Sequence, residues 1–299
     1  MQDACMAFPA LSAVTELFKP ITWFPPMWAF TCGVVASGEG FSTRAAVIAT
    51  GVLLAGPLVC ATSQAVNDWF DRHVDAINEP HRPIPSGRIP GRWGLYLAIA
   101  WTLLSLLVAS TLGLWGFLAG ALGLALAWAY SAPPLRLKRN GWWGNAACGL
   151  SYEGLAWVTG AAVMAGSTLP GSRSLLLALL YSISAHGIMT LNDFKAIEGD
   201  RQMGIGSLPV RLGVDNAAQV ACWVMAVPQV VVIAMLFSWQ APWHALAVVG
   251  LLAAQLILMR HFTRAPVARA LFYSGFGVPL FVAGMMVSAF ALRSVGGGN

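Results

Sequence analysis

Two short segments of the chain combine carboxylates, amides and aromatic side chains in the same order. The first is Asn67-Asp68-Trp69-Phe70-Asp71-Arg72-His73-Val74-Asp75, and the second is Asn192-Asp193-Phe194-Lys195-Ala196-Ile197-Glu198-Gly199-Asp200. Each begins with an Asn-Asp pair followed by an aromatic residue, and each closes with an Asp. This repetition suggests two related halves that face each other across one site.

The first segment places three carboxylates on one face of a helix, because Asp68, Asp71 and Asp75 are spaced by three and four residues. Like charges held this closely favour a cation between them. Mg²⁺ prefers hard oxygen ligands and is typically held by one or two carboxylates together with substrate phosphates. The segment therefore predicts a magnesium site that also receives a diphosphate.

The second segment offers Asp193 and Asp200, with Asn192 as a neutral oxygen ligand and Glu198 in reserve. We predict that the two segments hold two metal ions, Mg²⁺ or alternatively Mn²⁺, bridged by a diphosphate. The predicted ligands are Asn67, Asp68, Asp71, Asp75, Asn192, Asp193 and Asp200. The alternative is that these acids are solvated loop charges or form ion pairs with neighbouring basic residues, but their repetition at equal depth favours the metal site.

Basic side chains are interleaved with these acids. The proline-rich stretch from Asn78 to Arg88 predicts a stiff loop near the first segment. Arg and Lys bind phosphate oxygens through charge-assisted hydrogen bonds. The predicted diphosphate-binding residues are Arg72, Arg82, Lys138, Lys195 and Arg201. For the nearby Arg136 and Arg139, a general bias of basic residues toward one membrane face is the stronger explanation.

Such a site is equipped to ionise an allylic diphosphate. Metal ions and basic side chains stabilise the negative charge that develops on the leaving group. The allylic cation that remains needs a dry pocket until a nucleophile captures it. Turnover should depend most on Asp68, Asp71 and Asp193.

Four further residues are candidates for the acceptor pocket: Tyr152, Glu153, Trp157 and His186. An ionisable residue within a membrane segment is a functional hypothesis by default, so Glu153 can orient the acceptor or bind a tetrapyrrole substituent. Trp157 can stabilise a cation with its ring face, the alternative being core packing. His186 can ligate the magnesium of a porphyrin, the alternative being an ordinary core histidine.

The composition places all these groups in a membrane protein. Only 10% of the 299 residues are charged and 58% are hydrophobic, with a mean hydropathy of +0.69, whereas soluble chains carry about 25% charged residues. Nine continuous apolar stretches are long enough to span a bilayer, and they predict an all-α polytopic bundle rather than a barrel. They cover residues 20–38, 45–66, 93–113, 115–131, 145–166, 174–192, 218–238, 243–260 and 271–292.

One integral membrane domain is expected over residues 1–299, with flexible segments at 1–16 and 294–299. Nine spans place 14 of the 17 Lys and Arg residues on the side of the N-terminus, leaving Arg44, Arg173 and Arg293 on the other. Basic residues concentrate on the cytoplasmic side, so we expect a cytoplasmic N-terminus, cytoplasmic motifs and a C-terminus outside. The five cysteines lack a CxxC pair and indicate no zinc site.

These motifs resemble the UbiA superfamily of intramembrane prenyltransferases. Residues 67–75 match that superfamily's first motif, N-D-x-x-D-x-x-x-D, in full. Its second motif, D-x-x-x-D, aligns with Ala196 and Asp200, so the first acid is missing and Asn192 and Asp193, one turn earlier, take its place. The resemblance implies nine helices and assigns diphosphate binding to Arg72, Arg82 and Lys138.

Within that superfamily, the chain is similar to the chlorophyll and bacteriochlorophyll synthases. The similar sequence segments include residues 20–26 (PITWFPP), 82–90 (RPIPSGRIP), 192–195 (NDFK) and 207–210 (SLPV). The resemblance implies esterification of the propionate of bacteriochlorophyllide a with geranylgeranyl or phytyl diphosphate, without a general base. It also implies a bacterial inner or intracytoplasmic membrane, pigment-synthesis or photosystem-assembly proteins as partners, and no nucleic acid.

Three alternative functions stay open at this point. A prenyltransferase for a quinone precursor or for haem would need attack by carbon on the cation. A transporter would place its polar residues near the bilayer midplane and on broken helices. A passive pigment-binding subunit would bind pigment equally well with Asp71 changed to Ala.

Overall fold

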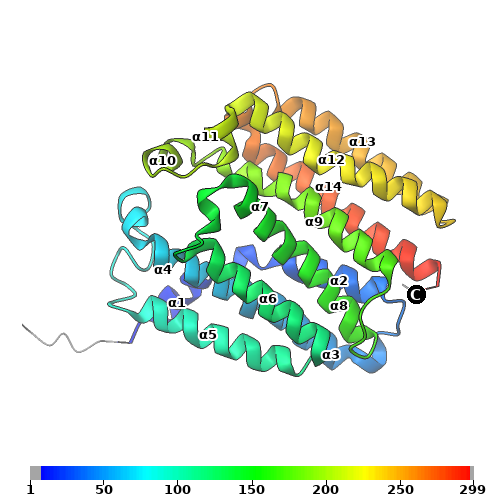
Figure 1. Cartoon of the computed structure of the whole chain (residues 1–299), viewed down its shortest axis with the longest axis horizontal. Helices are drawn as coiled ribbons and strands as arrows, with labels where there is room; N and C mark the ends of the chain where they lie inside the picture. The colour runs from blue at the N-terminus through cyan, green and yellow to red at the C-terminus, as the bar shows by residue number, and fades with distance from the viewer. Residues whose placement is uncertain (1–7, 297–299) are drawn as a thin grey trace, which may run out of the picture.

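The computed structural model describes residues 8–296, and every regular element in that range is a helix (Figure 1). This confirms the predicted all-α bundle for the part of the chain described. The predicted flexible ends lie partly outside it, at residues 1–7 and 297–299. Within it, helix α1 occupies Leu11–Phe18 and helix α14 ends at Ser294, so these parts of the predicted flexible ends are helical.

Seven helical rods are long and apolar enough to cross a membrane. They are Ser42–Ile77 (largely α3 Ala45–Leu53, η3 Leu54–Cys60 and α4 Ala61–Asn78), α5 Trp93–Ser110, α6 Gly113–Ser131, α9 Ser172–Asp193, α12 Val214–Ser238, α13 Pro242–Phe262 and α14 Pro266–Ser294. Large apolar side chains such as Leu103, Leu107 and Ile257 are more than 60% exposed on these rods. A surface of this kind is stable against lipid and not against water.

The other two predicted stretches are helical but fall outside those seven rods. The stretch 20–38 becomes a short 3₁₀ turn, η1 Pro20–Thr22, followed by α2 Phe24–Ala36, which has only 13 residues. Two prolines stand at the start of α2, where a missing backbone N–H costs nothing. The stretch 145–166 lies in a rod made of α7 Gly141–Gly149, η5 Leu150–Leu155 and α8 Ala156–Met164.

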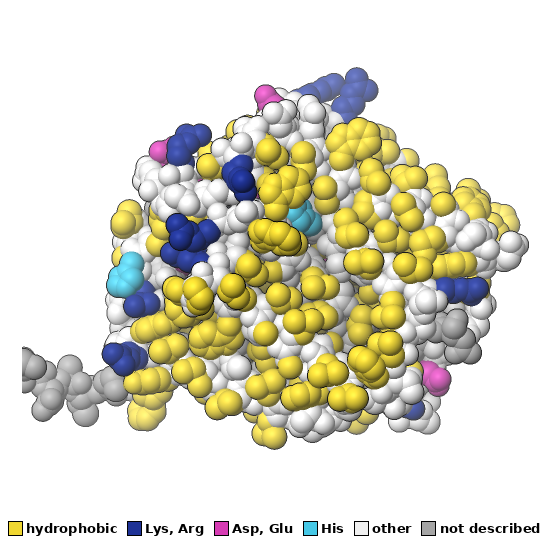
Figure 2. Space-filling view, in the orientation of Figure 1, with side chains coloured by type: hydrophobic (Ala, Val, Ile, Leu, Met, Phe, Trp, Pro, Cys, Tyr) yellow, Lys and Arg dark blue, Asp and Glu magenta, His cyan; other side chains and the backbone are white. Residues whose placement is uncertain are grey.

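Three short helices lie at one end of the bundle. Helices α1, α10 (Ile197–Gln202) and α11 (Leu208–Leu212) lie near the end of α4 on the left and upper left of Figure 1. Two loops are tied there: Gly141 donates its backbone N–H to Gly206, whose own N–H is donated to Arg139. Figure 2 shows most Lys and Arg side chains of this face along the same end and the upper edge, with hydrophobic side chains over much of the remainder.

Helices α2 and α8 cross with almost no space between their backbones. A Cβ atom on Gly160 would lie 2.1 Å from the carbonyl oxygen of Phe30, and one on Gly33 would lie 2.0 Å from that of Trp157. Small residues permit this approach, which gains dispersion contacts that lipid cannot supply. This crossing fixes α2, and therefore Phe30, against the rod that carries Tyr152.

We predict that Gly160→Ala lowers the melting temperature of the detergent-purified protein, because the added methyl must separate two backbones. Overpacking of this kind costs about 1–3 kcal/mol. Gly250→Ala is the matched control: nothing lies within 4 Å of a Cβ at that position on α13. An equal melting temperature for both variants would contradict the close crossing.

Candidate active site

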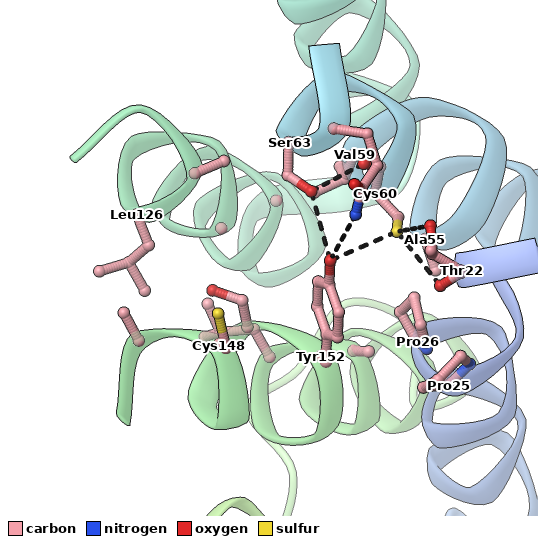
Figure 3. Close-up of a pocket in the computed structure, with 18 of the residues that line it drawn as sticks. Thr22, Pro25, Pro26, Ala55, Val59, Cys60, Ser63, Leu126, Cys148 and Tyr152 are labelled. Atoms are coloured by element: carbon pink, nitrogen blue, oxygen red, sulfur yellow. Dashed lines mark hydrogen bonds between the residues drawn. The ribbon is translucent and has the colours of Figure 1, made fainter. Parts of the chain in front are cut away.

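A cavity of about 380 Å³ lies between α2, the α3–η3–α4 rod, α6, the α7–η5–α8 rod and the end of α9 (Figure 3). Asn67 and Asn192, the first residues of the two motifs, both line it. Phe30, Gly51 and Thr159 line it from positions farther along their helices. The two motifs therefore meet at one end of a single, mostly apolar cavity.

Two of the cavity walls contain a π-helical turn. In η3, Pro57 has no backbone N–H and interrupts the regular α-helical ladder. The carbonyl of Pro57 accepts a hydrogen bond of 3.1 Å from the Trp101 indole, which ties η3 to α5. The second π turn, η5, carries Tyr152, whose ring crosses the cavity toward Ser63 (Figure 3). Such turns often occur at functional sites.

The carboxylates at the end of α4 are neutralised by basic residues from distant segments. Asp68, which is 1% exposed, pairs with Lys19 at 2.6 Å and with Arg82 at 3.5 Å. Arg82 also donates to Asp75 at 2.9 Å. A buried carboxylate is stable only when paired in this way, so α1 and the proline-rich loop are both tied to the motif.

Asp71 is held from the opposite side of the motif. The Lys138 ammonium donates to it, the Arg136 guanidinium lies 3.6 Å from it, and the Asn67 amide donates to it at 3.0 Å. Asn67 is itself held by the Ser131 hydroxyl at 3.1 Å. The loop between α6 and α7 thus supplies the bases for Asp71.

The pKa values of Arg82 and Lys138 shift in opposite directions in this environment. Burial opposes the charge of Arg82, but Asp68 and Asp75 outweigh it and raise the pKa of the guanidinium above its ordinary value. Burial lowers the pKa of the Lys138 ammonium, and Asp71 only partly offsets it. Asp71 therefore offsets part of the cost of burying the Lys138 charge.

The second motif has no Lys or Arg paired with its leading acid among the described residues. Asp193 accepts a hydrogen bond of 3.1 Å from the Asn145 amide. Asp200, on α10, is half-buried, and burial raises the pKa of its carboxyl while Ser207 and Lys138 act in the opposite direction. These acids are the ones left to bind an additional cation.

The residues present fit a magnesium ion that is shared with a ligand. In the range 8–296, no three His, Cys, Asp or Glu side chains converge closely enough to hold a metal ion by themselves. One oxygen of Asp68, Oδ2, is nevertheless buried without a partner. Mg²⁺ typically takes one or two carboxylates and completes its shell with water and phosphate oxygens, as this donor set requires.

In the part of the chain that the structure describes, three predicted diphosphate ligands form no ion pair with the carboxylates predicted to bind metal. Arg72 stacks on the Trp69 ring at 4.1 Å and donates to the Trp69 carbonyl. Arg201 pairs with Glu198 on the exposed side of α10 at 3.6 Å. Lys195 is exposed and forms no ion pair with any residue the structure describes. Their roles in diphosphate binding stay predictions. Arg82 and Lys138, by contrast, contact the carboxylates of the first motif directly.

Of the four acceptor candidates, Tyr152 alone lines the cavity. Glu153 and Trp157 follow the lining residues Tyr152 and Ala156 by one position, about 100° around the rod, and neither lines the cavity. Trp157 is fully buried and donates to Ser174 at 3.0 Å, which is core packing. Glu153 is buried away from the cavity, with Oε2 unpartnered.

His186 is also buried outside the cavity lining. Its ring lies 5.5 Å from that of Trp142, and both ring nitrogens lack a hydrogen-bond partner. No part of the cavity reaches it, so the geometry gives no contact with an acceptor held there.

Several residues at the site were not predicted from the sequence. The sequence alone predicts no role in the site for Lys19, and it attributes Arg136 to the bias of basic residues toward one membrane face. Asn145 lies in an apolar stretch, where an amide signals a buried polar contact. That signal was available, since buried amides require partners.

The described geometry can be compared with known proteins. The model of the UbiA prenyltransferase family matches residues 23–292. The bacteriochlorophyll synthase 33 kDa chains of Rhodobacter capsulatus and Cereibacter sphaeroides are 56% and 55% identical, each covering 96% of this chain and 95% of the relative. The fold resembles a UbiA homolog from Archaeoglobus fulgidus bound to GPP and Mg²⁺, with a TM-score of 0.65 at 21% identity, covering 94% of this chain and 99% of that one.

We predict that Lys19→Gln weakens binding of magnesium pyrophosphate about tenfold, the loss expected for one hydrogen bond between charged groups. Isothermal titration of the detergent-purified protein measures it. Arg264→Gln removes an exposed charge in the loop between α13 and α14 and serves as the control. Unchanged affinity in Lys19→Gln would show that Lys19 serves only to neutralise Asp68.

Proposed function

The chain belongs to the UbiA prenyltransferase family, and we propose that it is a bacteriochlorophyll synthase. In this reaction a geranylgeranyl or phytyl group passes from its diphosphate to the propionate of bacteriochlorophyllide a, and diphosphate is released. The observation that carries the proposal is 56% identity to a bacteriochlorophyll synthase chain over 96% of this sequence. The cavity with both Asn-Asp motifs at one end supplies the matching site.

We expect the basic residues that contact the first motif to bind the diphosphate. Lys19, Arg82 and Lys138 each already donate to a carboxylate oxygen, and phosphate oxygens can take the place of those acceptors. A bound Mg²⁺ supplies further positive charge against the leaving group. We expect Mn²⁺, which accepts the same oxygen ligands, to substitute for it.

The bond changes are balanced without a base. The bond between the allylic C1 and the diphosphate oxygen breaks, and its electron pair leaves with the diphosphate. A propionate oxygen then donates an electron pair to C1 and forms the ester. Because the acceptor enters as a carboxylate, no proton has to be removed from it. The chain's own contribution is to hold both partners and to exclude the water that would otherwise capture the cation.

The depth of the cavity supports a donor of four isoprene units. Residues that line it on α6 run from Tyr130 to Ala119, a rise of about 17 Å. A geranylgeranyl chain has about 15 backbone bonds, each advancing roughly 1.25 Å, so it extends about 19 Å. A slightly bent chain of this length therefore fills the cavity from the motifs to its far end.

The helical rods also suggest how the chain crosses the membrane and on which side each terminus lies. We propose nine spans, made of the seven long rods together with α2 and the α7–η5–α8 rod. The N-terminus and the motif end then lie on the cytoplasmic side of a bacterial inner or intracytoplasmic membrane, and the C-terminus lies outside. The 14 to 3 distribution of Lys and Arg supports this orientation.

We predict that Asp68→Asn, Asp71→Asn and Asp193→Asn each reduce ester formation at least a hundredfold while the proteins stay folded. Each change removes a charge that holds the metal and the diphosphate in register. The assay supplies bacteriochlorophyllide a and geranylgeranyl diphosphate to detergent-purified protein and separates the esterified pigment. Chelation with EDTA should abolish the same signal, and Mg²⁺ should restore it.

Other outcomes of this assay would point to the alternatives. Activity only with a hydroxybenzoate or with haem would identify a different acceptor. Substrate flux across proteoliposomes without release of diphosphate would identify a transporter. Full ester formation by all three variants would remove the metal site from the reaction.

We predict that Gly123→Leu shifts donor preference from geranylgeranyl toward geranyl diphosphate. A Cβ at Gly123 meets only ordinary contacts, 3.7 Å from Val59 and 3.9 Å from Leu155, so the new side chain extends into the cavity. About 10 Å of depth, roughly two isoprene units, separates Gly123 from Tyr130. The measurement is kcat/KM for each donor, with Gly250→Leu on α13 as control; an unchanged ratio would place the prenyl chain elsewhere.

A further inference from the structure

A compact polar cluster interrupts the apolar wall of the cavity. The Tyr152 hydroxyl lies 3.4 Å from the Ser63 hydroxyl, 3.3 Å from the Gln64 amide nitrogen and 3.6 Å from the Cys60 sulfur (Figure 3). All four side chains line the cavity. Burying polar groups beside an apolar chain is unfavourable unless they gain partners, so this cluster requires an explanation.

The protons of the cluster can be assigned by counting donors. The Gln64 amide donates to the Tyr152 oxygen. The Ser63 hydroxyl donates its proton to the Cys60 carbonyl at 2.7 Å, so it is an acceptor toward Tyr152. The Tyr152 proton is therefore directed only at Ser63, over the long distance of 3.4 Å. A stronger acceptor that enters the cavity can take this proton without leaving any cluster member unpaired.

The cluster lies at the depth where the new bond must form. Ser63 and Gln64 precede Asn67 by four and three residues, so they lie one helical turn, about 5 Å, below the motif end. A diphosphate held by Arg82 and Lys138 beside the motif would place the allylic C1 just inside the cavity. The Tyr152 hydroxyl thus faces the position that the acceptor oxygen must reach.

A carboxylate fits this position better than any part of the donor does. The prenyl chain has no acceptor for the Tyr152 proton, and the diphosphate is served by Lys19, Arg82 and Lys138 at the motif end. A carboxylate has two oxygens: one can accept the tyrosine proton while the other attacks C1. A hydrogen bond to a charged acceptor is also roughly twice as strong as one between neutral groups.

We propose that the Tyr152 hydroxyl, oriented by Gln64 and Ser63, binds the acceptor's carboxylate and holds it against the allylic carbon. The inference rests on the proposed function and assigns the acceptor end of that site. Tyr152 keeps its proton throughout: the C1–oxygen bond of the ester forms, the C1–oxygen bond to diphosphate breaks, and no proton is transferred. Positioning the carboxylate also limits capture of the cation by water.

The test is Tyr152→Phe, which retains the ring and removes the hydroxyl. The assay supplies bacteriochlorophyllide a and geranylgeranyl diphosphate and measures both the ester and the free prenyl alcohol. KM for the pigment should rise about tenfold, the loss expected for one hydrogen bond to a charged group. The share of donor converted to free alcohol should rise as well, while KM for the donor stays within twofold.

Tyr181→Phe is the matched control. Tyr181 is another buried tyrosine, but its hydroxyl bonds Gly284 and Ser288 in the interface of α9 and α14, outside the cavity. This variant should leave the ratio of alcohol to ester unchanged, even if its stability falls. A ratio that rises equally in both variants would overturn the inference, because loosened packing would then explain it.

Gln64→Met provides a second variant that decides the matter if Tyr152→Phe does not fold. It removes the amide that orients the hydroxyl, so pigment KM and the alcohol share should rise in the same direction by a smaller factor. Unchanged values in the folded variants, with normal ester formation by the unmodified protein, would overturn this inference alone. Failure of the unmodified protein to form any ester would instead overturn the proposed function.

Discussion

The architecture of the site depends on neutralising carboxylates that are withdrawn from water at the end of a membrane helix. Asp68 is almost completely buried, and an unpaired charge there would cost several kcal/mol. The compensating charges come from three separate segments: Lys19 after α1, Arg82 in the proline-rich loop, and Lys138 in the loop between α6 and α7. This electrostatic requirement acts together with the apolar cluster in which Leu17 of α1 and Ile89 of the proline-rich loop pack with Val66 of α4, and it gathers basic side chains at one end of the bundle.

Below this charged layer, the bundle has to leave space while it remains closed to water. Close helix crossings provide the rigidity: Gly33 and Gly160 let α2 and α8 meet at backbone contact. The π turns η3 and η5 lie in the two rods that face each other across the cavity. A cavity persists only where the surrounding structure cannot collapse into it. The tight helix crossing therefore provides rigidity, and the irregular turns lie in the wall that the cavity requires.

Most of the architecture follows from patterns that a sequence displays directly. Continuous apolar stretches located the helices, and the spacing of Asp68, Asp71 and Asp75 located one face of α4. The ion pair between Lys19 and Asp68 could not be predicted in this way. It forms because α1 docks beside α4 and because the backbone turns through a left-handed conformation at Lys19. The sequence also does not show which of Tyr152 and Glu153 points into the cavity. A π turn advances the helix by a different angle per residue, so regular 3.6-residue spacing does not relate the positions before η5 to those after it.

The two motifs, although alike in sequence, carry different charge balances, and this difference has a chemical consequence. The first motif has its carboxylates matched by Lys19, Arg82, Lys138 and Arg136, so it presents bases to an incoming anion without any further cation. Asp193 of the second motif accepts from the Asn145 amide and has no Lys or Arg partner among the described residues, so it would gain most from a cation that arrives with the anion. An anion bound at the first motif alone would leave the second unsatisfied. Binding of a metal-complexed diphosphate would satisfy both, and it would then couple occupancy of the site to the complex that the proposed reaction consumes.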